Sequence, residues 1–412
     1  MSSARADDGG AALLASLRER IRRDGPMPLD EYMRLCQADP EHGYWQRAGS
    51  IGAAGDFITA PEISQVFGEL IGLWCAVVWQ GMSRPAPLRL IELGPGRGTL
   101  MRDALRAARR VPGFLDATTV HLVEASAPLR EMQRQAFPPP LWGSPPPPHA
   151  EGVSSTRRGE GLGVGGAMTA NVLQSPPPPP SPTSGEGVPL AIAWHDSLEQ
   201  VPDDAAIVIA NEFLDALPIR QLEYLDGGWR ERVVDIDAQG VLRLAAGPRV
   251  DLGVEGLDAP PEQGVILELR AGEDQLLAQL ARRQAPFTAL FIDYGPAGSA
   301  YGDTLQAAHR HVWVDPLSLP GIADLTAHVQ FASLAHKACA MGLVADGPIT
   351  QAEFLGRLGI AERAARLMSA NPERAGEIET GVQRLMSPTG MGELFKAMAV
   401  RSRTLPSPPP FV

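Results

Sequence analysis

The chain has 412 residues, of which 44% are hydrophobic and 20% charged, so it is long enough for one large or two ordinary domains with a substantial core. Its formal net charge of −12 argues against a nucleic acid bound through its phosphates. No apolar stretch approaches the length of a membrane-spanning helix, so we expect no membrane insertion.

The cysteines and the N-terminus indicate where the protein works. Cys36, Cys75 and Cys339 are scattered and form no CxxC pair, so neither a disulfide framework nor a metal site is expected. The first residues, which include Asp7 and Asp8, fit neither a secretory signal nor an acid-poor mitochondrial presequence. These features predict a cytoplasmic protein.

Residues 1–85 are expected to form an N-terminal helical cap region. Helical patterns cover 11–24 and 28–38, and a loop then leads to an apolar helix that begins near Pro61, with Thr59 as a candidate cap. Apolar residues recur along this helix and are expected to pack in the core: Val66, Leu70, Leu73, Val77 and Val78.

The stretch LRLIELGPGRGTL, residues 88–100, predicts a strand that leads through a glycine-rich loop into a helix. Leucine and isoleucine crowd the strand, and a helical pattern follows from Thr99 to Arg109. Alternate glycines let a ligand approach the backbone beside the free N–H groups at the helix start. The residues expected to bind a nucleotide-type cofactor here are Glu92, Gly94, Pro95, Gly96 and Gly98.

From residue 88 onward, strands alternate with helices. This rhythm predicts an α/β fold of Rossmann type, with a doubly wound, mostly parallel sheet. Further strands are expected within 119–126, 190–198, 205–218 and 287–296. Ligands bind such sheets beyond the carboxyl ends of the strands. The polar residues at these ends should therefore converge: Glu124, Asp196, Asn211, Glu212 and Asp293.

Two insertions interrupt the core that we expect over 86–345. Residues 138–189 are rich in Pro, Gly and Ser and lack apolar periodicity, which predicts a disordered surface insertion; a proline-tract ligand for an adaptor domain is the alternative. Residues 219–247 alternate between polar and apolar and contain turn signals, which predicts antiparallel hairpins. After 325 the pattern is mainly helical, so 346–412 is expected to be a C-terminal helical region with a tail.

The glycine spacing distinguishes between nucleotide cofactors. A G-x-G-x-x-G dinucleotide fingerprint would need glycine at Thr99, whereas the glycines here fall as G-x-G-x-G, with Glu92 two residues before the first. This pattern favours S-adenosylmethionine over NAD, and an NAD-dependent dehydrogenase is the outside alternative. Glu124 is placed to accept hydrogen bonds from both ribose hydroxyls, and Asp196 from the adenine amino group. A turn that serves only helix–sheet packing is the structural alternative.

Six blocks, in order along the chain, resemble the MidA-type methyltransferases: GDFITAPEISQVFGELIG, LIELGPGRGTL, VHLVEAS, ANEFLDALP, FIDYG and GIADLTAHVQF. That family includes the mitochondrial complex I assembly factor that methylates arginine on a core subunit. The resemblance spans roughly residues 25–345, apart from 138–189. It implies a class I methyltransferase fold, S-adenosylmethionine as methyl donor and a protein arginine as acceptor. The absence of a presequence suggests a bacterial member.

A guanidinium acceptor is protonated and poorly nucleophilic, so carboxylates must clamp it and orient one nitrogen. We expect Glu212 to be the principal clamp, Asp215 to assist it and Asn211 to orient the acceptor. Phe213 is expected beside the methyl group. The structural alternatives are an acid at a helix N-terminus for Asp215 and a core residue for Phe213.

Two further blocks supply candidates on the acceptor side. Asp56 and Thr59 precede a helix that we expect to close over the cofactor, with Gln65 facing inward. His328, with Asp324 and Thr326 just before it, is a candidate substrate-binding residue and general base, and a structural histidine is the alternative.

The function expected from these features is protein arginine N-methylation, with a respiratory complex I core subunit or a similar protein as substrate. A methyltransferase acting on a small molecule and a non-catalytic, cofactor-binding complex I assembly factor are the alternatives. The sequence does not indicate an oligomeric state.

Overall fold

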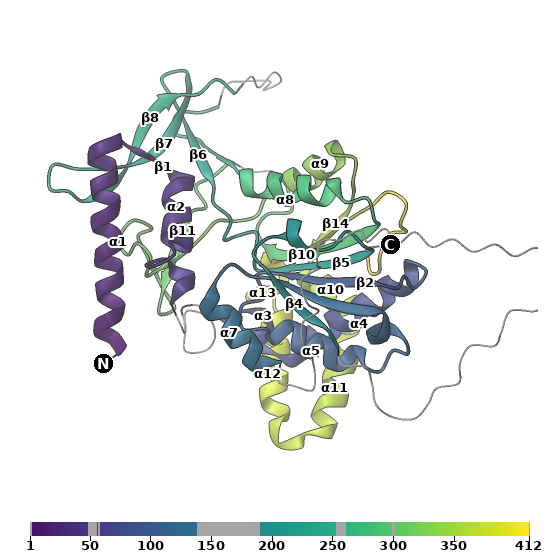
Figure 1. Cartoon of the computed structure of the whole chain (residues 1–412). Helices are drawn as coiled ribbons and strands as arrows, with labels where there is room; N and C mark the ends of the chain where they lie inside the picture. The colour runs from purple at the N-terminus through teal and green to yellow at the C-terminus, as the bar shows by residue number, and fades with distance from the viewer. Residues whose placement is uncertain are drawn as a thin grey trace, which may run out of the picture.

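A seven-stranded sheet in the order β14-β15-β10-β5-β2-β3-β4 forms the centre of the molecule (Figure 1). The computed structural model describes residues 2–47, 56, 58–137, 190–252, 261–298 and 301–411, so the expected insertion 138–189 lies outside the described residues. The strands are β2 (Leu88–Leu93), β3 (Thr118–Val123), β4 (Ile192–His195), β5 (Ala206–Asn211), β10 (Phe287–Tyr294), β14 (Val344–Thr350) and β15 (Phe395–Arg401). Five of them, β2 to β5 and β10, are parallel, and β15 is antiparallel to both of its neighbours. The predicted doubly wound, mostly parallel sheet is confirmed.

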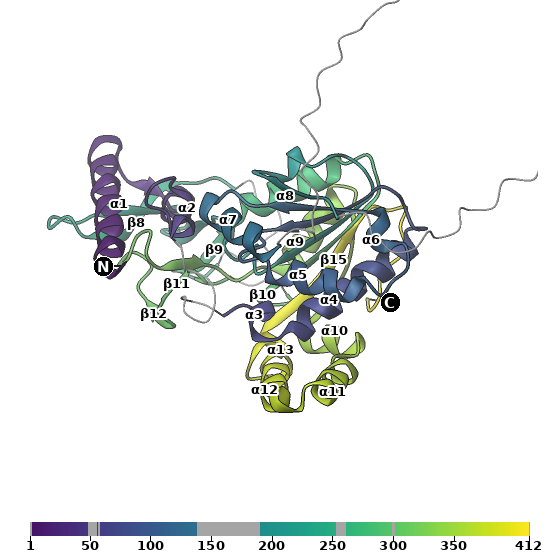
Figure 2. The same ribbon diagram turned by 60° about the horizontal axis from the view of Figure 1, so that its bottom comes forward.

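Helices cover both faces of this sheet because its inner strands are apolar on both sides. Every residue of β5 and of β10 is buried. Ile207 and Ile209 belong to the core cluster on one face, and Val208, which points the other way, belongs to the cluster on the opposite face. The first face packs against α4 and α5 and the second against α8 and α9 (Figure 2). The helices of this core are α4 (Gln65–Gly81), α5 (Thr99–Ala108), α6 (Phe114–Ala117), α7 (Ala127–Ala136), the short η2 (Leu198–Gln200), α8 (Ala271–Arg282) and α9 (Phe331–Ala340).

The sequence pattern predicted a helical C-terminal region, and the structure differs from this prediction. The region also contributes β15, which lies between β10 and β14 in the sheet. The segment FKAMAVR of β15 carries residues with little strand preference, and its strand form follows from pairing with both neighbours. Between the two strands lie α10 (Gln351–Arg357), α11 (Ile360–Ala370), η3 (Pro372–Arg374), α12 (Ala375–Met386) and α13 (Met391–Leu394).

A second assembly, which we call the capping subdomain, packs beside the carboxyl ends of the parallel strands (Figure 1). It combines two N-terminal helices with antiparallel strands inserted after β5 and after β10, and the predicted hairpins are among them. Its apolar core joins Leu17, Tyr32, Val234 and Leu325 from four separate elements. The elements are α1 (Ser2–Asp24), β1 (Met27–Pro28), α2 (Leu29–Ala38), β6 (Arg220–Leu225), β7 (Gly228–Ile236), β8 (Leu242–Arg249), β9 (Ile266–Leu269), β11 (Gln306–His309), β12 (Val312–Val314) and β13 (Asp324–Thr326).

The helix expected to begin near Pro61 is broken in two. A short α3 (Ala60–Ile63) ends at Ser64, whose hydroxyl accepts the N–H of Val66 and so caps α4, whereas the Thr59 side chain makes no capping bond. The predicted apolar stripe on α4 is partly wrong, because Val77 is 46% exposed. Packing against the sheet, α5 and α11 buries most of the circumference of α4, so its solvent face is narrow. Leu73 is half-buried, and the other three residues of the stripe, Val66, Leu70 and Val78, are buried as expected.

Candidate functional site

A cavity of about 690 Å³ lies between the carboxyl ends of the parallel strands and the capping subdomain. After the roles expected from the sequence, we call the end at β2, β3 and β4 the cofactor end and the end at β5, β10 and β13 the acceptor end. Of the residues expected to form the site, it is lined by Glu92, Gly94, Pro95, Gly96, Glu124, Asp196, Asn211, Glu212, Phe213, Asp215, Asp324, Thr326 and His328. Of the five polar residues expected to converge at the strand ends, four line this cavity, whereas Asp293 is buried and does not line it.

The glycine loop depends on conformations that only glycine adopts readily. Gly94, Gly96 and Gly98 have φ of +60°, +51° and +79°. A β-carbon on Gly94 would lie 2.7 Å from Phe213 Cδ2, and one on Gly98 would lie 2.9 Å from Phe137 Cε2. The space beside these two glycines is therefore filled by aromatic side chains, so the packing explanation holds for them. Gly94 and Gly96 also line the cavity, and Gly98 does not.

Glu92, at the end of β2, is a buried carboxyl group that faces the cavity. Its Oε2 atom has no hydrogen-bond partner among the described residues. Burial, with a smaller contribution from the nearby Glu124, raises the pKa of Glu92 to about 8. Such a group is suited to a cationic donor, for example the ammonium group of a bound amino-acid moiety.

Glu124, directly after β3, is held in place at the cofactor end. Its Oε1 accepts the Ser126 N–H at 2.8 Å, and its Oε2 accepts the Gln133 side-chain amide at 3.3 Å. Burial is the main cause that raises its pKa to about 7, and these hydrogen bonds act in the opposite direction. A carboxylate oxygen accepts more than one bond, so a ribose diol can still donate to both oxygens.

Asp196 lies at the rim of the cofactor end, where its side chain is 67% exposed. It forms an ion pair with Arg130, and this hydrogen bond is the main cause that lowers its pKa. Its backbone N–H donates to Gln200 at 2.9 Å. The position suits a contact with an adenine edge, but solvent makes any such contact weak.

The acceptor residues lie on a tight loop that Asp293 organises from below. The buried Asp293 Oδ2 accepts the backbone N–H groups of Phe213, Leu214 and Asp215 at 2.9–3.2 Å, and its Oδ1 accepts that of Tyr294 at 2.9 Å. Four amide donors on one carboxylate fix the path of the chain after β5.

Glu212 occupies a strained backbone conformation within this loop, with φ of +49°. Its Oε1 accepts the Ala60 N–H at 2.8 Å and the Asn211 side-chain amide at 3.1 Å. These contacts tie the start of α3 to the end of β5 and leave Oε2 as the oxygen for a ligand. Burial raises the pKa of Glu212 to about 7.

Several buried side-chain oxygen atoms at the acceptor end have no hydrogen-bond donor among the described residues. Asp215 lies 6% exposed, and burial raises its pKa to about 6 despite a hydrogen bond with Tyr294. Burial also raises the pKa of Asp324 well above the ordinary range. The oxygens at this end that have no hydrogen-bond partner among the described residues are Asn211 Oδ1, Asp215 Oδ1, Asp324 Oδ1 and Thr326 Oγ1.

His328 closes the acceptor end beside Tyr294. The two rings meet edge to face, with centroids 5.3 Å apart. Burial lowers the pKa of His328, so its imidazole is neutral at pH 7 and can accept a proton or a hydrogen bond.

Two residues of the segment GDFITAPEISQ depart from expectation. Asp56 does not line the cavity: its Oδ1 accepts the Arg310 N–H at 2.6 Å and lies 3.4 Å from His309 Nδ1, so it anchors the hairpin of β11 and β12. Gln65 does not line the cavity either, because it lies in the first turn of α4, beyond the break at Ser64. Thr59 does line it.

Sequence reasoning missed the lining residues that come from the ends of the chain. Arg34 and Trp45 come from the N-terminal segment, and Arg384 and Leu394 come from α12 and α13. No local motif marks them, because they reach the cavity only through the packing of distant elements. Gln133, which holds Glu124, was also missed: it lies nearby in α7, and no motif distinguishes it from other polar helix residues.

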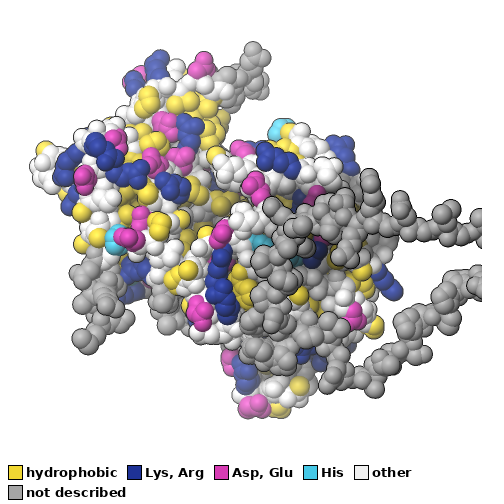
Figure 3. All heavy atoms as spheres, in the orientation of Figure 1, with side chains coloured by type: hydrophobic (Ala, Val, Ile, Leu, Met, Phe, Trp, Pro, Cys, Tyr) yellow, Lys and Arg dark blue, Asp and Glu magenta, His cyan; other side chains and the backbone are white. Residues whose placement is uncertain are grey.

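The described residues contain neither a metal-binding cluster nor a membrane-spanning helix. No group of three or more His, Cys, Asp or Glu residues in this part of the chain is arranged to hold a metal ion. No described helix has both the length and the apolar character needed to cross a bilayer. Figure 3 shows basic and acidic side chains interspersed over one face of the molecule.

Comparison with known proteins gives consistent matches over nearly the whole chain. A family model described as "Putative S-adenosyl-L-methionine-dependent methyltransferase" matches residues 70–349. "Protein arginine methyltransferase NDUFAF7, mitochondrial" from Danio rerio is 36% identical over 396 residues, which is 94% of this chain and 86% of that protein. The Homo sapiens protein of the same name is 33% identical over 408 residues, covering 94% of this chain and 83% of that protein. A crystal structure of a Burkholderia thailandensis protein bound to S-adenosyl-homocysteine superimposes with a TM-score of 0.77 at 27% identity, covering 98% of this chain and 95% of that chain.

These matches overturn one expectation. We predicted a cytoplasmic protein from the composition of the first residues, and that prediction is wrong, because the curated relatives are named as mitochondrial proteins. The acidic residues near the start, Asp7 and Asp8, are a weak signal of location.

Proposed function

The chain belongs to the MidA-like family of S-adenosyl-L-methionine-dependent methyltransferases, and we propose that it transfers the methyl group to an arginine side chain of a protein. That it is a methyltransferase with S-adenosyl-L-methionine as cofactor follows from the matched family and from the bound ligand of the Burkholderia protein. The choice of arginine as acceptor is supported by the acceptor end of the cavity and by the printed names of the relatives.

The cofactor end fits this cofactor. Glu92 offers an unpartnered buried oxygen to an ammonium group, and Glu124 offers two anchored oxygens to a ribose diol. Gly94 and Gly96 line the cavity wall between them. When bound, S-adenosyl-L-methionine supplies an electrophilic methyl group.

The observation that carries the proposal is the number of hydrogen-bond-accepting oxygens without a partner at the acceptor end of the cavity. A guanidinium group has five N–H donors in a fixed plane and no acceptor. The unpartnered oxygens of Asn211, Asp215 and Asp324 are complementary to such a donor set. A substrate without such donors would leave these oxygens unsatisfied, at a cost of about 1–3 kcal/mol for each buried group.

The charges also favour a cation. Burial raises the pKa of Glu212 to about 7 and that of Asp215 to about 6, so in the empty site both carboxyl groups are partly protonated near neutral pH. A bound guanidinium would stabilise both anions. We assign Glu212 as the main clamp through Oε2, with Asp215 assisting it and Asn211 orienting the acceptor.

The chain's residues then have two tasks: to align the acceptor nitrogen and to take up its surplus proton. They align one guanidinium nitrogen with the methyl group, with Phe213 at the cavity wall beside it. The nitrogen forms its bond to the methyl carbon while the carbon–sulfur bond breaks and its electron pair stays on sulfur. The surplus proton on that nitrogen passes to a neighbouring base, for which Glu212 or the neutral His328 is available.

The natural acceptor is a protein in this proposal, because the printed names of the relatives are those of protein arginine methyltransferases. A core subunit of respiratory complex I, or a similar protein, is the substrate that we propose from the family resemblance.

The test is product analysis. The purified protein is incubated with tritiated S-adenosyl-L-methionine and a protein extract of cells that lack its gene, and the labelled protein is hydrolysed to amino acids. We expect label in methylarginine with the wild type and at least about a hundredfold less with Glu212→Gln. Both proteins should bind S-adenosyl-homocysteine equally in calorimetry. Label in lysine, in histidine or in small molecules alone would contradict the proposal, and cofactor binding without any transfer would favour a non-catalytic role.

A further inference from the structure

His328 is a candidate base that lines two cavities. It lines the main cavity and also a second cavity of about 490 Å³, which it shares with Thr304 and Leu394. Space on both sides means that side-chain packing alone leaves the imidazole room to move. The ring of Tyr294 contacts the imidazole edge to face.

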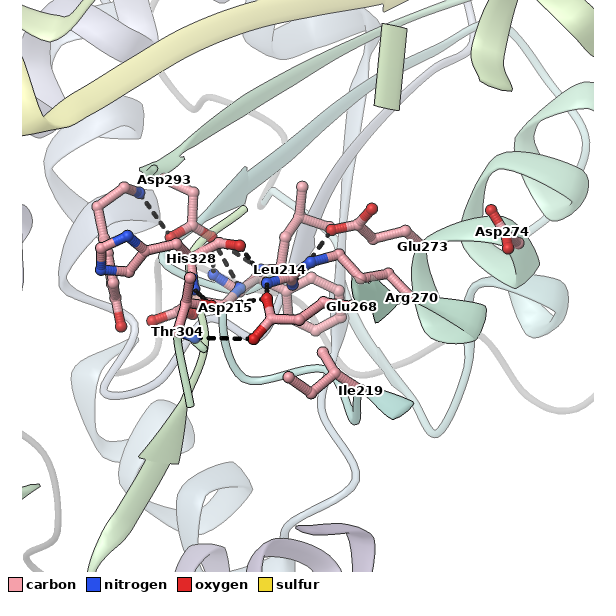
Figure 4. Close-up of polar contacts among 12 residues, drawn as sticks. Leu214, Asp215, Ile219, Glu268, Arg270, Glu273, Asp274, Asp293, Thr304 and His328 are labelled. Atoms are coloured by element: carbon pink, nitrogen blue, oxygen red, sulfur yellow. Dashed lines mark hydrogen bonds and ion pairs between the residues drawn. The ribbon is translucent and has the colours of Figure 1, made fainter. Parts of the chain in front are cut away.

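The backbone of His328, in contrast, is held on both sides (Figure 4). Its N–H donates to Thr304 Oγ1 at 3.0 Å, and its carbonyl oxygen accepts a hydrogen bond from Arg270 Nη2. Thr304 in turn donates to Glu268 through its backbone N–H at 2.9 Å and through its hydroxyl at 2.7 Å. Glu268 Oε2 lies 3.6 Å from Arg270 Nη2, which closes a ring of four residues.

This ring is buried and charged. The side chains of Arg270 and Glu268 are 3% and 0% exposed. Arg270 also contacts Glu273 at 3.4 Å, and Glu268 accepts the Gln221 amide at 2.9 Å. A buried ion pair contributes little net stability compared with apolar packing, so its use here suggests a requirement for geometry.

We propose that Arg270, Glu268 and Thr304 are positioning residues that hold His328 at the acceptor end of the cavity. This inference rests on the proposed transfer to arginine, because the group being positioned is a base for that acceptor. None of the three residues lines the main cavity, so they act through the backbone of His328.

The experiment compares Thr304→Val with Thr304→Ser. Valine keeps the shape and charge of the site but removes the hydroxyl that accepts the His328 N–H, whereas serine keeps that hydroxyl. Thr350→Val is the matched control, because Thr350 Oγ1 also accepts one backbone N–H, that of Glu353, at 3.1 Å. Thr350 lies at the start of α10, outside both cavities.

Two readouts are taken on the full chain with S-adenosyl-homocysteine or labelled cofactor. The first is the rate of label transfer into methylarginine at saturating cofactor. The second is an NMR titration of the His328 Cε1–H resonance, assigned by its loss in His328→Gln. The charged groups that face His328 are Glu268 and Arg270, and Tyr294 also contacts it; the threonine variants change none of them.

We expect Thr304→Val to lower the transfer rate at least about tenfold, because a small displacement of a reacting group is costly. The pKa of His328, which burial lowers, should rise toward its ordinary value of about 6.5 as the ring gains solvent. Thr304→Ser and Thr350→Val should match the wild type in both readouts. Unchanged His328 titration and rate in Thr304→Val would overturn the proposal.

Arg270→Lys provides a second variant if Thr304→Val does not fold. It keeps the positive charge, but lysine cannot bind the His328 carbonyl and Glu273 at the same time. We again expect a lower transfer rate and a higher His328 pKa, and no change in either would overturn the proposal. A wild type that makes no methylarginine would contradict the proposed function, while the NMR comparison would still decide whether the ring holds His328.

Discussion

At the scale of single residues, a comparison of Glu124 with Asp196 shows whether burial decides how strongly an acidic side chain binds the cofactor. Both are acids at the ends of neighbouring strands, and both line the cofactor end. Glu124 is 9% exposed and anchored by two hydrogen bonds, whereas the Asp196 side chain is 67% exposed and paired with Arg130.

We expect Glu124→Gln to weaken S-adenosyl-homocysteine binding by about 2 kcal/mol, or roughly thirtyfold in Kd, because it removes charge-assisted bonds in a buried setting. Asp196→Asn should cost less than about 1 kcal/mol, because water competes at the rim. Calorimetric titration of both variants checks this order. Equal losses, or a larger loss for Asp196→Asn, would show that Glu124 does not hold the ribose.

The same residues show what the sequence could predict. Glu124 and Glu212 were identified because each lies at the end of a strand of a parallel sheet, and such ends meet at one edge. Glu92 was identified because it lies two residues before the first glycine of the loop. Asp56 was misplaced because a carboxylate in a loop can point either to a ligand or to a neighbouring backbone, and here it accepts the Arg310 N–H. Sequence spacing does not distinguish these two orientations.

At the scale of elements, the loop after β5 depends on the carboxylate of Asp293 beneath it. We expect Asp293→Asn to lower the free energy of unfolding by about 3 kcal/mol, because asparagine offers one acceptor oxygen to four N–H donors and turns an NH₂ group toward them. Urea unfolding followed by circular dichroism measures the loss.

Asp237→Asn is the control for this substitution. Asp237 Oδ1 also accepts two backbone N–H groups, those of Gln239 and Val241, both at 2.8 Å, but on an exposed hairpin turn. The Asp237→Asn substitution should lower the free energy of unfolding by only about 1 kcal/mol, because water can replace the lost hydrogen bonds on this exposed turn. Similar values for the two variants would mean that the loop after β5 does not depend on Asp293.

Elements were predicted well where periodicity was strong. The strands that became β2, β3, β5 and β10 and the hairpin of β6 and β7 were expected from apolar runs and turn signals. The strands β14 and β15 were missed, because their form follows from pairing with each other and with β10 rather than from local preference. The break between α3 and α4 was missed because Ser64 resembles an ordinary polar helix residue until its capping bond is seen.

At the scale of the whole molecule, several carboxyl groups are buried in one cavity before any ligand arrives. Burial raises the pKa of Glu92 to about 8 and those of Glu124 and Glu212 to about 7. The folded state therefore binds more protons than the unfolded state between about pH 4.5 and pH 8. The stabilising effect of these protons is full below the unfolded pKa and is lost as pH rises through the folded pKa.

We therefore expect the thermal midpoint of the ligand-free protein to fall from pH 6 to pH 8. Saturating S-adenosyl-homocysteine should make the fall shallower, because its hydrogen-bond donors stabilise the ionised forms of Glu92 and Glu124. Calorimetric scans at both pH values, with and without the ligand, measure the difference. Equal slopes in the two states would contradict the assignment of these carboxyl groups to the cofactor.

The sequence alone did not predict which distant segments of the chain would come together to line the cavity. The cavity takes residues from α2, from the parallel strand ends, from β11 to β13 and from α12 and α13. Local patterns predicted the strand ends, but not that Arg34 and Arg384 would reach the same cavity. Such contacts depend on the packing of the capping subdomain and of the C-terminal helices on the sheet.

The most direct test of the central claim is a crystal structure of the protein with S-adenosyl-homocysteine and N-acetyl-arginine amide. We expect the guanidinium group at the acceptor end, within hydrogen-bond distance of Glu212 and Asp215 and with one nitrogen facing the sulfur atom. Density for the arginine elsewhere on the protein, with the acceptor end occupied by its own side chains, would contradict the assignment of this cavity to arginine methylation.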